Sequence, residues 1–132
     1  MKMMTSTRQV GSVTIVDISG RIELGGESAA LRNLVSDLLS EGHTQILLNL
    51  DNVHYIDSAG LGSLVGSFTS ARKQGGELKL VNLTEKVTDL MQMTKLYTVF
   101  DVSNDEAAAL KSFSQSTAAT ASQPMGARAQ RP

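Results

Sequence analysis

Apolar and polar residues follow two different periods along the chain, and the changes between them predict its secondary structure. Residues 5–10 and 12–19 have the composition of β-strands, and the glycine between them predicts a hairpin turn. Gly20 is expected to end the second strand, and the pair Gly25-Gly26 marks a loop. We therefore expect the chain to begin with an antiparallel pair of strands.

A helical period replaces the strand pattern in the next segment. Its apolar residues recur at i, i+3, i+4, i+7 and i+8, which places them on one face of a helix: Leu31, Leu34, Val35, Leu38 and Leu39. Gly42 is placed to end this helix. Residues 45–50 follow as a short, nearly continuous apolar run, which is typical of a strand covered on both faces.

The later segments repeat this alternation. A second helix begins near Ser58 and ends at Gly75-Gly76, with one apolar stripe: Leu61, Leu64, Val65 and Phe68. A strand is predicted at residues 77–83, a helix at 85–95 and a short strand at 99–102. Ser103 and Glu106 have the spacing of a capping box for a last helix that runs through Phe113.

The order β-β-α-β-α-β-α-β-α predicts an α/β fold. Strands that alternate with helices imply right-handed crossovers and a parallel run of strands, and the first hairpin adds an antiparallel strand at one side. We expect one small sandwich domain over residues 1–113, with a mixed, mostly parallel sheet of about five strands and about four helices. Residues 114–132 contain no Leu, Ile, Val or aromatic residue and are predicted to be a disordered tail.

The composition excludes several classes of function. The 132 residues include 12 Lys and Arg and 13 Asp and Glu, so no basic face is expected that could bind nucleic acid. The lack of cysteine excludes disulfides and thiolate sites, and the spacing of His43 and His54 matches no metal-ligand pattern. No stretch approaches the roughly 20 apolar residues of a membrane span, and the N-terminus lacks the apolar core of a secretory signal. We expect a cytoplasmic protein without a metal, a cofactor or a membrane partner.

The stretch of residues 54–62 carries the main candidate chemistry. Ser58 lies where a strand gives way to a helix, next to Asp57 and ahead of two glycines. Ser58 or Asp57 can cap the helix by accepting a hydrogen bond from a backbone N–H, a contribution of about 1 kcal/mol. Alternatively, Ser58 is phosphorylated, which adds a charge of about −1.5 to −2 that the helix dipole tolerates but a docking partner meets. The pattern alone leaves both possibilities open.

Two further interpretations of this stretch match its spacing poorly. A nucleophile elbow requires glycine two positions before the serine, where Ile56 stands, and a catalytic triad also needs a histidine base. The glycines at 60, 62 and 66 resemble a dinucleotide-binding fingerprint, but the last spacing is wrong by one. We interpret Gly62 and Gly66 instead as positions where the helix approaches its neighbours closely.

Three parts of the chain together follow the pattern of one known family. They are residues 11–22, residues 46–62 with the core Asp57-Ser58-Ala59-Gly60-Leu61-Gly62, and residues 76–83 with 100–102. These parts resemble STAS domains, specifically the bacterial anti-sigma factor antagonists. The resemblance covers nearly the whole chain up to Phe113.

The resemblance implies a phospho-switchable binding protein that acts in transcription regulation and is not an enzyme. Ser58 matches the serine that is phosphorylated by the cognate anti-sigma factor, a serine kinase with a histidine-kinase-like ATP-binding fold. The unphosphorylated antagonist binds this kinase and frees the sigma factor. Phosphorylation ends the binding, and a PP2C-like phosphatase restores it.

The partner-binding surface implied by this resemblance surrounds Ser58. Its expected members are Glu23, Asp57, Ser58, Ala59, Gly60, Leu61, Gly62 and Met93. Asp57 is expected to help position the hydroxyl in the kinase site. Met93 lies off the buried stripe that includes Met91, so we expect it to be exposed near the docking face.

Two departures from the family pattern are expected near the rim of this docking face. Asn49 stands where many members carry Asp, and Glu23 with its following glycines replaces a more usual Asp-containing loop. The alternative function is an accessory STAS subunit of a transport or nucleotide-sensing system. In that case Ser58 acts only as a helix cap.

Overall fold

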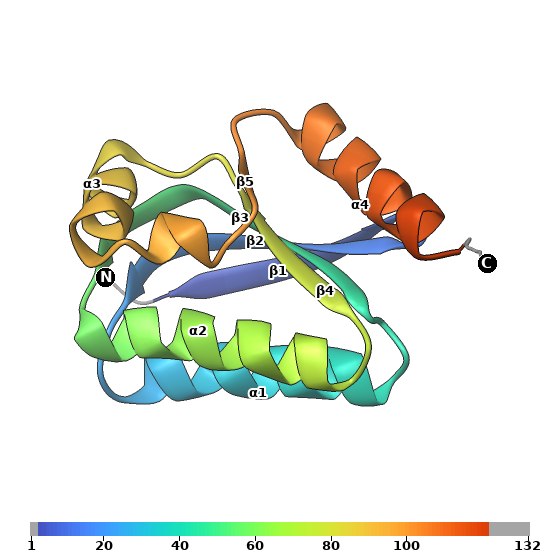
Figure 1. Ribbon diagram of the computed structural model, residues 1–132. Coiled ribbons are helices and arrows are strands. Elements are labelled where there is room, and N and C mark those ends of the chain that lie inside the picture. The colour runs from blue at the N-terminus through green and yellow to red at the C-terminus, as the bar shows by residue number, and fades with distance from the viewer. Residues whose placement is uncertain (1–2, 122–132) are drawn as a thin grey trace.

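A five-stranded mixed sheet forms the centre of the computed structural model, which describes residues 3–121. Its strands lie in the order in which they follow one another along the chain: β1 (Met4–Val10), β2 (Val13–Ile22), β3 (Gln45–Ile56), β4 (Glu77–Val81) and β5 (Val102–Ser103) (Figure 1). β1 pairs with β2 in antiparallel orientation, and every other neighbouring pair is parallel. The predicted α/β fold with a mostly parallel sheet is confirmed.

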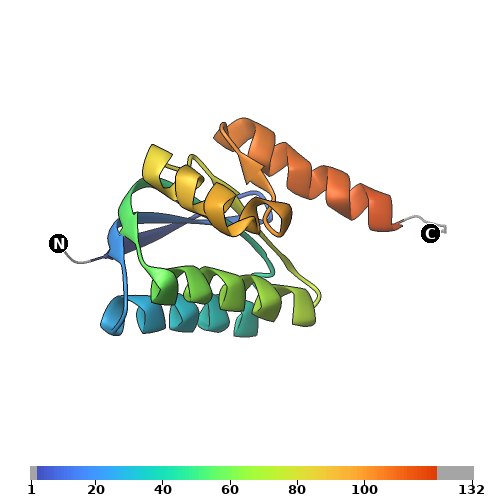
Figure 2. The same cartoon turned by 60° about the vertical axis from the view of Figure 1, so that its left-hand side comes forward.

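Helices cover both faces of this sheet. They are α1 (Gly26–Ser40), α2 (Ser58–Lys73), α3 (Glu85–Thr94) and α4 (Glu106–Ala121), with a short 3₁₀ helix at Leu96–Thr98. α1 and α2 lie side by side below the sheet in Figure 1, and α4 crosses the opposite face. Figure 2 shows α3 beside the junction at which β3 passes into α2. α3 therefore lies close to the point where α2 begins.

The hydrophobic core is divided by the sheet into two clusters. Ile46 and Leu48 of β3 pack in the cluster that includes the buried faces of α1, α2 and α3. Leu47, between them, packs with Ala109 and Phe113 of α4 in the second cluster. Successive side chains of a strand point to opposite faces, so a continuous apolar run fits a strand covered twice. The prediction for this segment is confirmed.

Both central strands continue beyond their predicted ends. Gly20 does not end β2; it adopts a φ of 96° beside an irregularity in the pairing with β3, after which β2 runs on to Ile22. β3 likewise continues past Leu50 to Ile56, because its polar half pairs with the second half of β2. Glycine at a β-bulge bends a strand without ending it. This extension places Asp57 directly after the strand.

The strands after α2 are shorter than predicted. β4 ends at Val81, because Asn82 adopts a positive φ of 60° that a strand cannot contain. The predicted strand at residues 99–102 is wrong except for its last residue. The 3₁₀ helix at Leu96–Thr98 precedes Val99, which still has helical torsions, so β5 forms only at Val102–Ser103.

Both ends of α4 differ from their predictions. The Ala108 N–H donates to the Asp105 carboxylate at 3.0 Å, so Asp105 and not Ser103 caps the helix. The helix also continues past Phe113 to Ala121, so the predicted tail boundary at Ser114 lies inside α4. Alanine has the highest intrinsic helix propensity, which allows helix without an apolar stripe. The remainder of the predicted tail, 122–132, lies outside the described residues.

Candidate functional site

The junction between β3 and α2 is organised by the carboxylate of Asp57. One carboxylate oxygen accepts a hydrogen bond from the Gly60 N–H at 2.8 Å, and the other accepts one from the Leu24 N–H at 2.9 Å. Asp57 has extended torsions, with φ −97° and ψ −174°, which is the usual conformation of an N-cap residue. This single side chain therefore caps α2 and also ties the loop that follows β2 to the start of the helix.

These contacts also fix the charge of Asp57. Hydrogen bonds donated by the Leu24 and Gly60 N–H groups hold the pKa of its carboxyl below the ordinary value. Both oxygens already accept hydrogen bonds from the backbone, so Asp57 remains ionised and is a poor proton acceptor. Its role in the structure is to hold the start of α2 and the loop after β2 in place through these two hydrogen bonds.

Ser58 is not the helix cap. It is the first residue of α2 and already has a helical conformation, whereas the extended residue before it has the cap geometry. The interpretation of Ser58 as a cap is therefore wrong. Its side chain is exposed, and its hydroxyl makes no hydrogen bond within the described part of the chain. The hydroxyl is thus available to a second molecule.

Two of the predicted partner-binding residues lie inside the protein. A Cβ atom at Gly60 would overlap the backbone carbonyl oxygen of Ile22, so no other residue fits there without displacing β2. Leu61 is buried in the larger core cluster. Both residues set the position of the α2 N-terminus, while half-buried Ala59 and exposed Gly62 lie at the surface.

The glycines further along α2 differ in their surroundings. Gly66 lies against the Arg32 side chain of α1, as expected for a position of close approach. A Cβ atom at Gly62 would meet nothing within 4 Å, so the prediction of close approach is wrong for that residue. Gly62 is compatible with a side chain, whereas Gly60 is not.

Exposed side chains from three segments lie near the junction between β3 and α2. Leu24 and Met93 have 77% and 80% of their surface exposed, and Tyr55 is also exposed. Glu23 pairs with Arg21 at 3.2 Å, and the Arg21 guanidinium lies 4.1 Å from the centre of the Tyr55 ring. A shallow depression beside Ile56 is lined by both Tyr55 and Met93, which brings α3 to the junction. We call Glu23, Leu24, Tyr55, Ser58 and Met93 the Ser58 surface.

The sequence interpretation did not assign Leu24, Tyr55 or Arg21 to the site. Leu24 had a detectable signal, since it is a large apolar residue in a loop beside two glycines, where no buried stripe requires one. Its N–H donates to Asp57, which lies 33 residues later in the chain, so this contact depends on the tertiary structure. The exposed position of Met93 agrees with the prediction.

Asn49 does not lie at the rim of this surface. Its side-chain amide donates to Asp17 at 2.8 Å, and the same carboxylate pairs with Arg8 at 2.7 Å. Seven strand residues, roughly 20 Å of chain, separate Asn49 from the end of β3. An aspartate at this position would place a second carboxylate against Asp17. The departure from the family pattern is therefore explained by the sheet and not by the docking face.

Other chemistry at this junction has little structural support. No hydrogen bond connects His43 or His54 with Ser58 within residues 3–121. Over the same residues, no group of three His, Cys, Asp or Glu side chains is placed to hold a metal ion. None of the described helices combines the length and the apolar character needed to cross a membrane.

Comparison with known proteins gives consistent similarities. The family model of the STAS domain matches residues 4–109. The anti-sigma-B factor antagonist of Bacillus subtilis is 39% identical over 88 residues, which are 67% of this chain and 79% of that protein. A crystal structure described as a candidate anti-sigma factor antagonist from Thermotoga maritima has a TM-score of 0.78 and 25% identity, covering 83% of this chain and 94% of that chain. The Bacillus cell fate determinant SpoIIAA in its phosphorylated form has a TM-score of 0.65 and 18% identity, covering 82% and 97%.

Proposed function

This chain belongs to the STAS domain family, and from this premise we propose that it is an anti-sigma factor antagonist whose binding is switched by phosphorylation of Ser58. It acts as a binding protein and not as an enzyme. The name and the 39% identity of the Bacillus subtilis relative support the antagonist function. The geometry supports the other part of the proposal, which is that the Ser58 hydroxyl is accessible for phosphorylation.

The proposed switch is supported by one observation: Asp57 caps α2, and the hydroxyl of Ser58 makes no hydrogen bond within the described chain. Asp57 makes the capping hydrogen bond to Gly60 at 2.8 Å, so Ser58 is exposed with its hydroxyl uncommitted. Phosphorylation of Ser58 would break no hydrogen bond of the described chain. A residue in this position is suited to modification without loss of the fold.

A phosphate at Ser58 would act on binding more than on folding. It would lie at the N-terminus of α2, where the helix dipole and the backbone N–H groups favour negative charge. It would also add about two negative charges next to the carboxylate of the neighbouring residue Asp57. A partner that docks against this surface would have to desolvate that charge. SpoIIAA, whose fold is similar, has a phosphorylated form, which supports the compatibility of this fold with a phosphate.

The proposed partner is an anti-sigma factor that is also a serine kinase with a histidine-kinase-like ATP-binding fold. The Ser58 surface would present the hydroxyl between the apolar side chains of Leu24 and Met93, which suit contact with a protein. Asp57 would hold the backbone of Ser58 in the kinase site. A PP2C-like phosphatase would restore the binding state.

In the alternative, an accessory subunit of a transport or nucleotide-sensing system, Ser58 would act only as a helix cap. Asp57 performs that task, so the role that this alternative leaves for Ser58 has no structural support. We favour the antagonist.

The proposal is tested by binding to purified anti-sigma-B factor of Bacillus subtilis in the presence of ADP, which cannot donate a phosphoryl group to Ser58. We expect Ser58→Ala to bind stably, and Ser58→Asp to bind at least tenfold more weakly than the unmodified chain. The thermal midpoint of Ser58→Asp should change by only a degree or two, because the exposed first turn accepts an anion. After a separate incubation of the unmodified chain with the same partner and ATP, intact-mass and peptide mass spectrometry should locate a single phosphoryl group on Ser58.

Thr69→Asp is the matched control, since it adds the same charge to an exposed position of α2 away from the Ser58 surface. It should bind like the unmodified chain. Equal affinity of Ser58→Asp and the unmodified chain would contradict the switch. Failure of the unmodified chain to bind would contradict this class of partner.

A further inference from the structure

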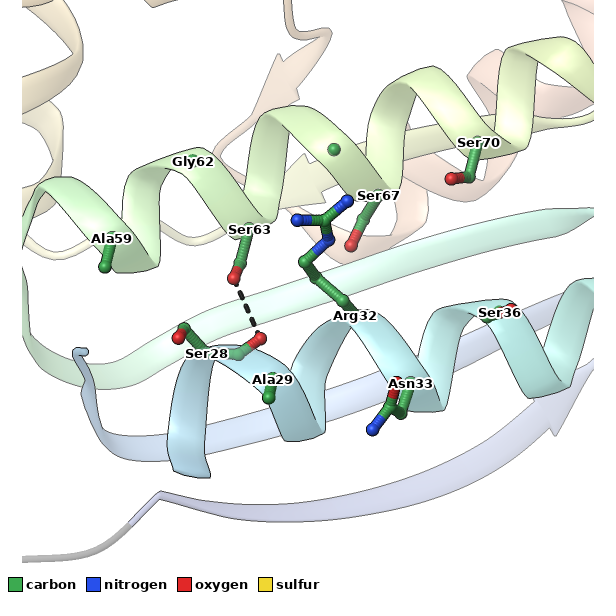
Figure 3. Close-up of a pocket in the computed structure, with 11 residues that line it drawn as sticks. Ser28, Ala29, Arg32, Asn33, Ser36, Ala59, Gly62, Ser63, Ser67 and Ser70 are labelled. Carbon is green, nitrogen blue, oxygen red and sulfur yellow. Dashed lines mark hydrogen bonds between the residues drawn. The ribbon is translucent and has the colours of Figure 1, made fainter. Parts of the chain in front are cut away.

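A groove between α1 and α2 has a polar character that the proposed antagonist function does not require. Its volume is about 660 Å³, and it extends from Ala59 and Gly62 near the start of α2 to Ser36 and Ser70 (Figure 3). The groove is separate from the Ser58 surface, since none of the five residues of that surface lines it.

Among the described residues, Arg32 is the only charged residue that lines this groove, and none of them contributes a carboxylate to it. The side chain rises from α1 towards α2 in Figure 3 and makes no ion pair with any described residue. The guanidinium lies against Gly66, where a Cβ atom would come within 3.1 Å of its carbon and nitrogen atoms. The absence of a side chain at Gly66 therefore leaves room for this cation across the groove.

Ser67 supplies a second, independent observation. Its side chain points from α2 towards α1, next to Arg32 (Figure 3), and the residue has only 2% of its surface exposed. Its hydroxyl finds no hydrogen-bond partner in the described structure, unlike that of Ser63, which donates to the Ser28 carbonyl at 2.8 Å. A buried hydroxyl without a partner is uncommon and requires an explanation.

The groove thus combines an unpaired guanidinium with uncommitted hydroxyl donors. The hydroxyls of Ser36 and Ser70, on the two facing helices, also make no hydrogen bond within the described residues. Guanidinium donors match the oxygens of phosphate in pairs, and the lack of a carboxylate removes the main source of repulsion. Arg32 would repel a cation, and the guanidinium and hydroxyl donors of this lining favour an anion over an apolar ligand.

We propose that this groove binds a phosphate group between Arg32 and the Ser67 hydroxyl. Rotation of the long Arg32 side chain turns its donor edge to the ligand and gives access to Ser67. The volume exceeds that of a single phosphate ion, so the group is either free or carried by a small organic molecule. This site is independent of phosphorylation at Ser58.

Amide chemical shifts of the full chain, followed during titration with inorganic phosphate against a sodium chloride background of equal ionic strength, test the proposal. We expect saturable shifts at residues 63–70 and in α1 around Arg32. Arg32→Gln should weaken binding at least tenfold, and Ser67→Ala should weaken it severalfold. Lys73→Gln, which removes a positive charge of α2 outside the groove, should bind as the unmodified chain does.

A parallel titration with glycerol 3-phosphate distinguishes the two sources of the phosphate group. Tighter binding than inorganic phosphate indicates an organic phosphate, and equal or weaker binding indicates the free ion. Shifts that do not saturate, or that persist unchanged in Arg32→Gln, would overturn the proposal. Thermal midpoints of all variants should match that of the unmodified chain, which excludes unfolding as the cause of lost binding.

Discussion

At the scale of single residues, the two neighbours Asp57 and Ser58 have different tasks. The carboxylate of Asp57 holds the N–H groups of Gly60 and Leu24 at 2.8 and 2.9 Å, and the hydroxyl of Ser58 is left exposed. An acidic cap accepts two donors from different parts of the chain, which a serine hydroxyl in its place does less well. A carboxylate with a structural role and a hydroxyl without a hydrogen bond in the described chain therefore lie on two consecutive residues.

Substitutions of Asp57 should separate the contributions of its two hydrogen bonds to stability. Asp57→Asn keeps one side-chain oxygen, so it should retain the cap to Gly60 and lose the bond to Leu24. Asp57→Ala should lose both. We expect the thermal midpoint, measured by circular dichroism, to fall by a few degrees for Asp57→Ala and by less for Asp57→Asn. If Asp57 also orients Ser58 for the kinase, Asp57→Asn should be phosphorylated more slowly; phosphorylation at the full rate would exclude that role.

The charge of Asp57 also predicts a dependence of stability on pH. Its pKa is lowered in the folded state, chiefly by the Leu24 N–H, so folding favours the ionised form. This contribution is complete well above the ordinary aspartate pKa of about 3.9 and is lost as the pH falls through the lower folded value. The difference in thermal midpoint between the unmodified chain and Asp57→Asn should be full at neutral pH and shrink below about pH 4. A difference that stayed constant down to acid pH would contradict the assignment.

At the scale of elements, the start of α2 is placed by close contact between two backbones. Gly60 faces the carbonyl of Ile22 at the end of β2, and the Asp57 N–H donates to the same carbonyl at 3.3 Å. The helix can approach the strand because Gly60 has no side chain. The position of Ser58 at the surface follows from this contact.

Gly60 and Gly62 form a matched pair for testing that contact. Gly60→Ala should destabilise the protein severely, because the added carbon overlaps backbone that cannot rotate away. Gly62→Ala should stabilise it by up to about 1 kcal/mol, since alanine is the better helix former and meets no neighbour. Urea unfolding measures both free energies. A tolerated Gly60→Ala would show that the helix can shift along the strand.

At the scale of the whole molecule, α4 closes the second face of the sheet with both apolar and polar contacts. Phe113 is buried in the smaller core cluster. Lys79, itself buried, reaches Asp101 at 3.1 Å and Ser112 at 3.0 Å, with its ammonium 4.9 Å from the centre of the Phe113 ring. Arg8 pairs with Glu106 at 2.6 Å and with Asp17, which connects α4 to β1 and β2. These contacts hold α4 to the sheet without reaching the Ser58 surface.

Phe113→Ala should therefore affect stability without affecting the proposed phosphorylation switch at Ser58. Loss of this ring leaves a cavity under α4, and we expect the free energy of unfolding to fall by about 3 kcal/mol or more. Hydrogen exchange of α4 amides should accelerate, while binding of the folded variant to the anti-sigma factor stays unchanged. Lys111→Ala, at an exposed position of the same helix, should leave stability within about 0.5 kcal/mol. Similar exchange rates in the two variants would show that α4 is held by other contacts.

The sequence by itself determined the features that depend on neighbours within about one helical turn. The apolar stripe from Leu31 to Leu39 and the doubly covered run at Ile46–Leu48 correctly predicted their elements and the class of fold. The same local signals located Ser58 at a strand–helix junction. Periodicity is a local property, because the face on which a side chain lies is set by the geometry of its own element.

Only the tertiary structure decided which groups meet at that junction. β3 continues to Ile56 through pairing with β2, the Asp57 carboxylate binds an N–H from 33 residues earlier, and Asn49 is paired with Asp17. The choice of Asp57 over Ser58 as the cap depended on the extended backbone that this longer β3 imposes. Such contacts join segments far apart in the chain, and their partners are fixed only when the sheet has formed, so a local pattern could not identify them.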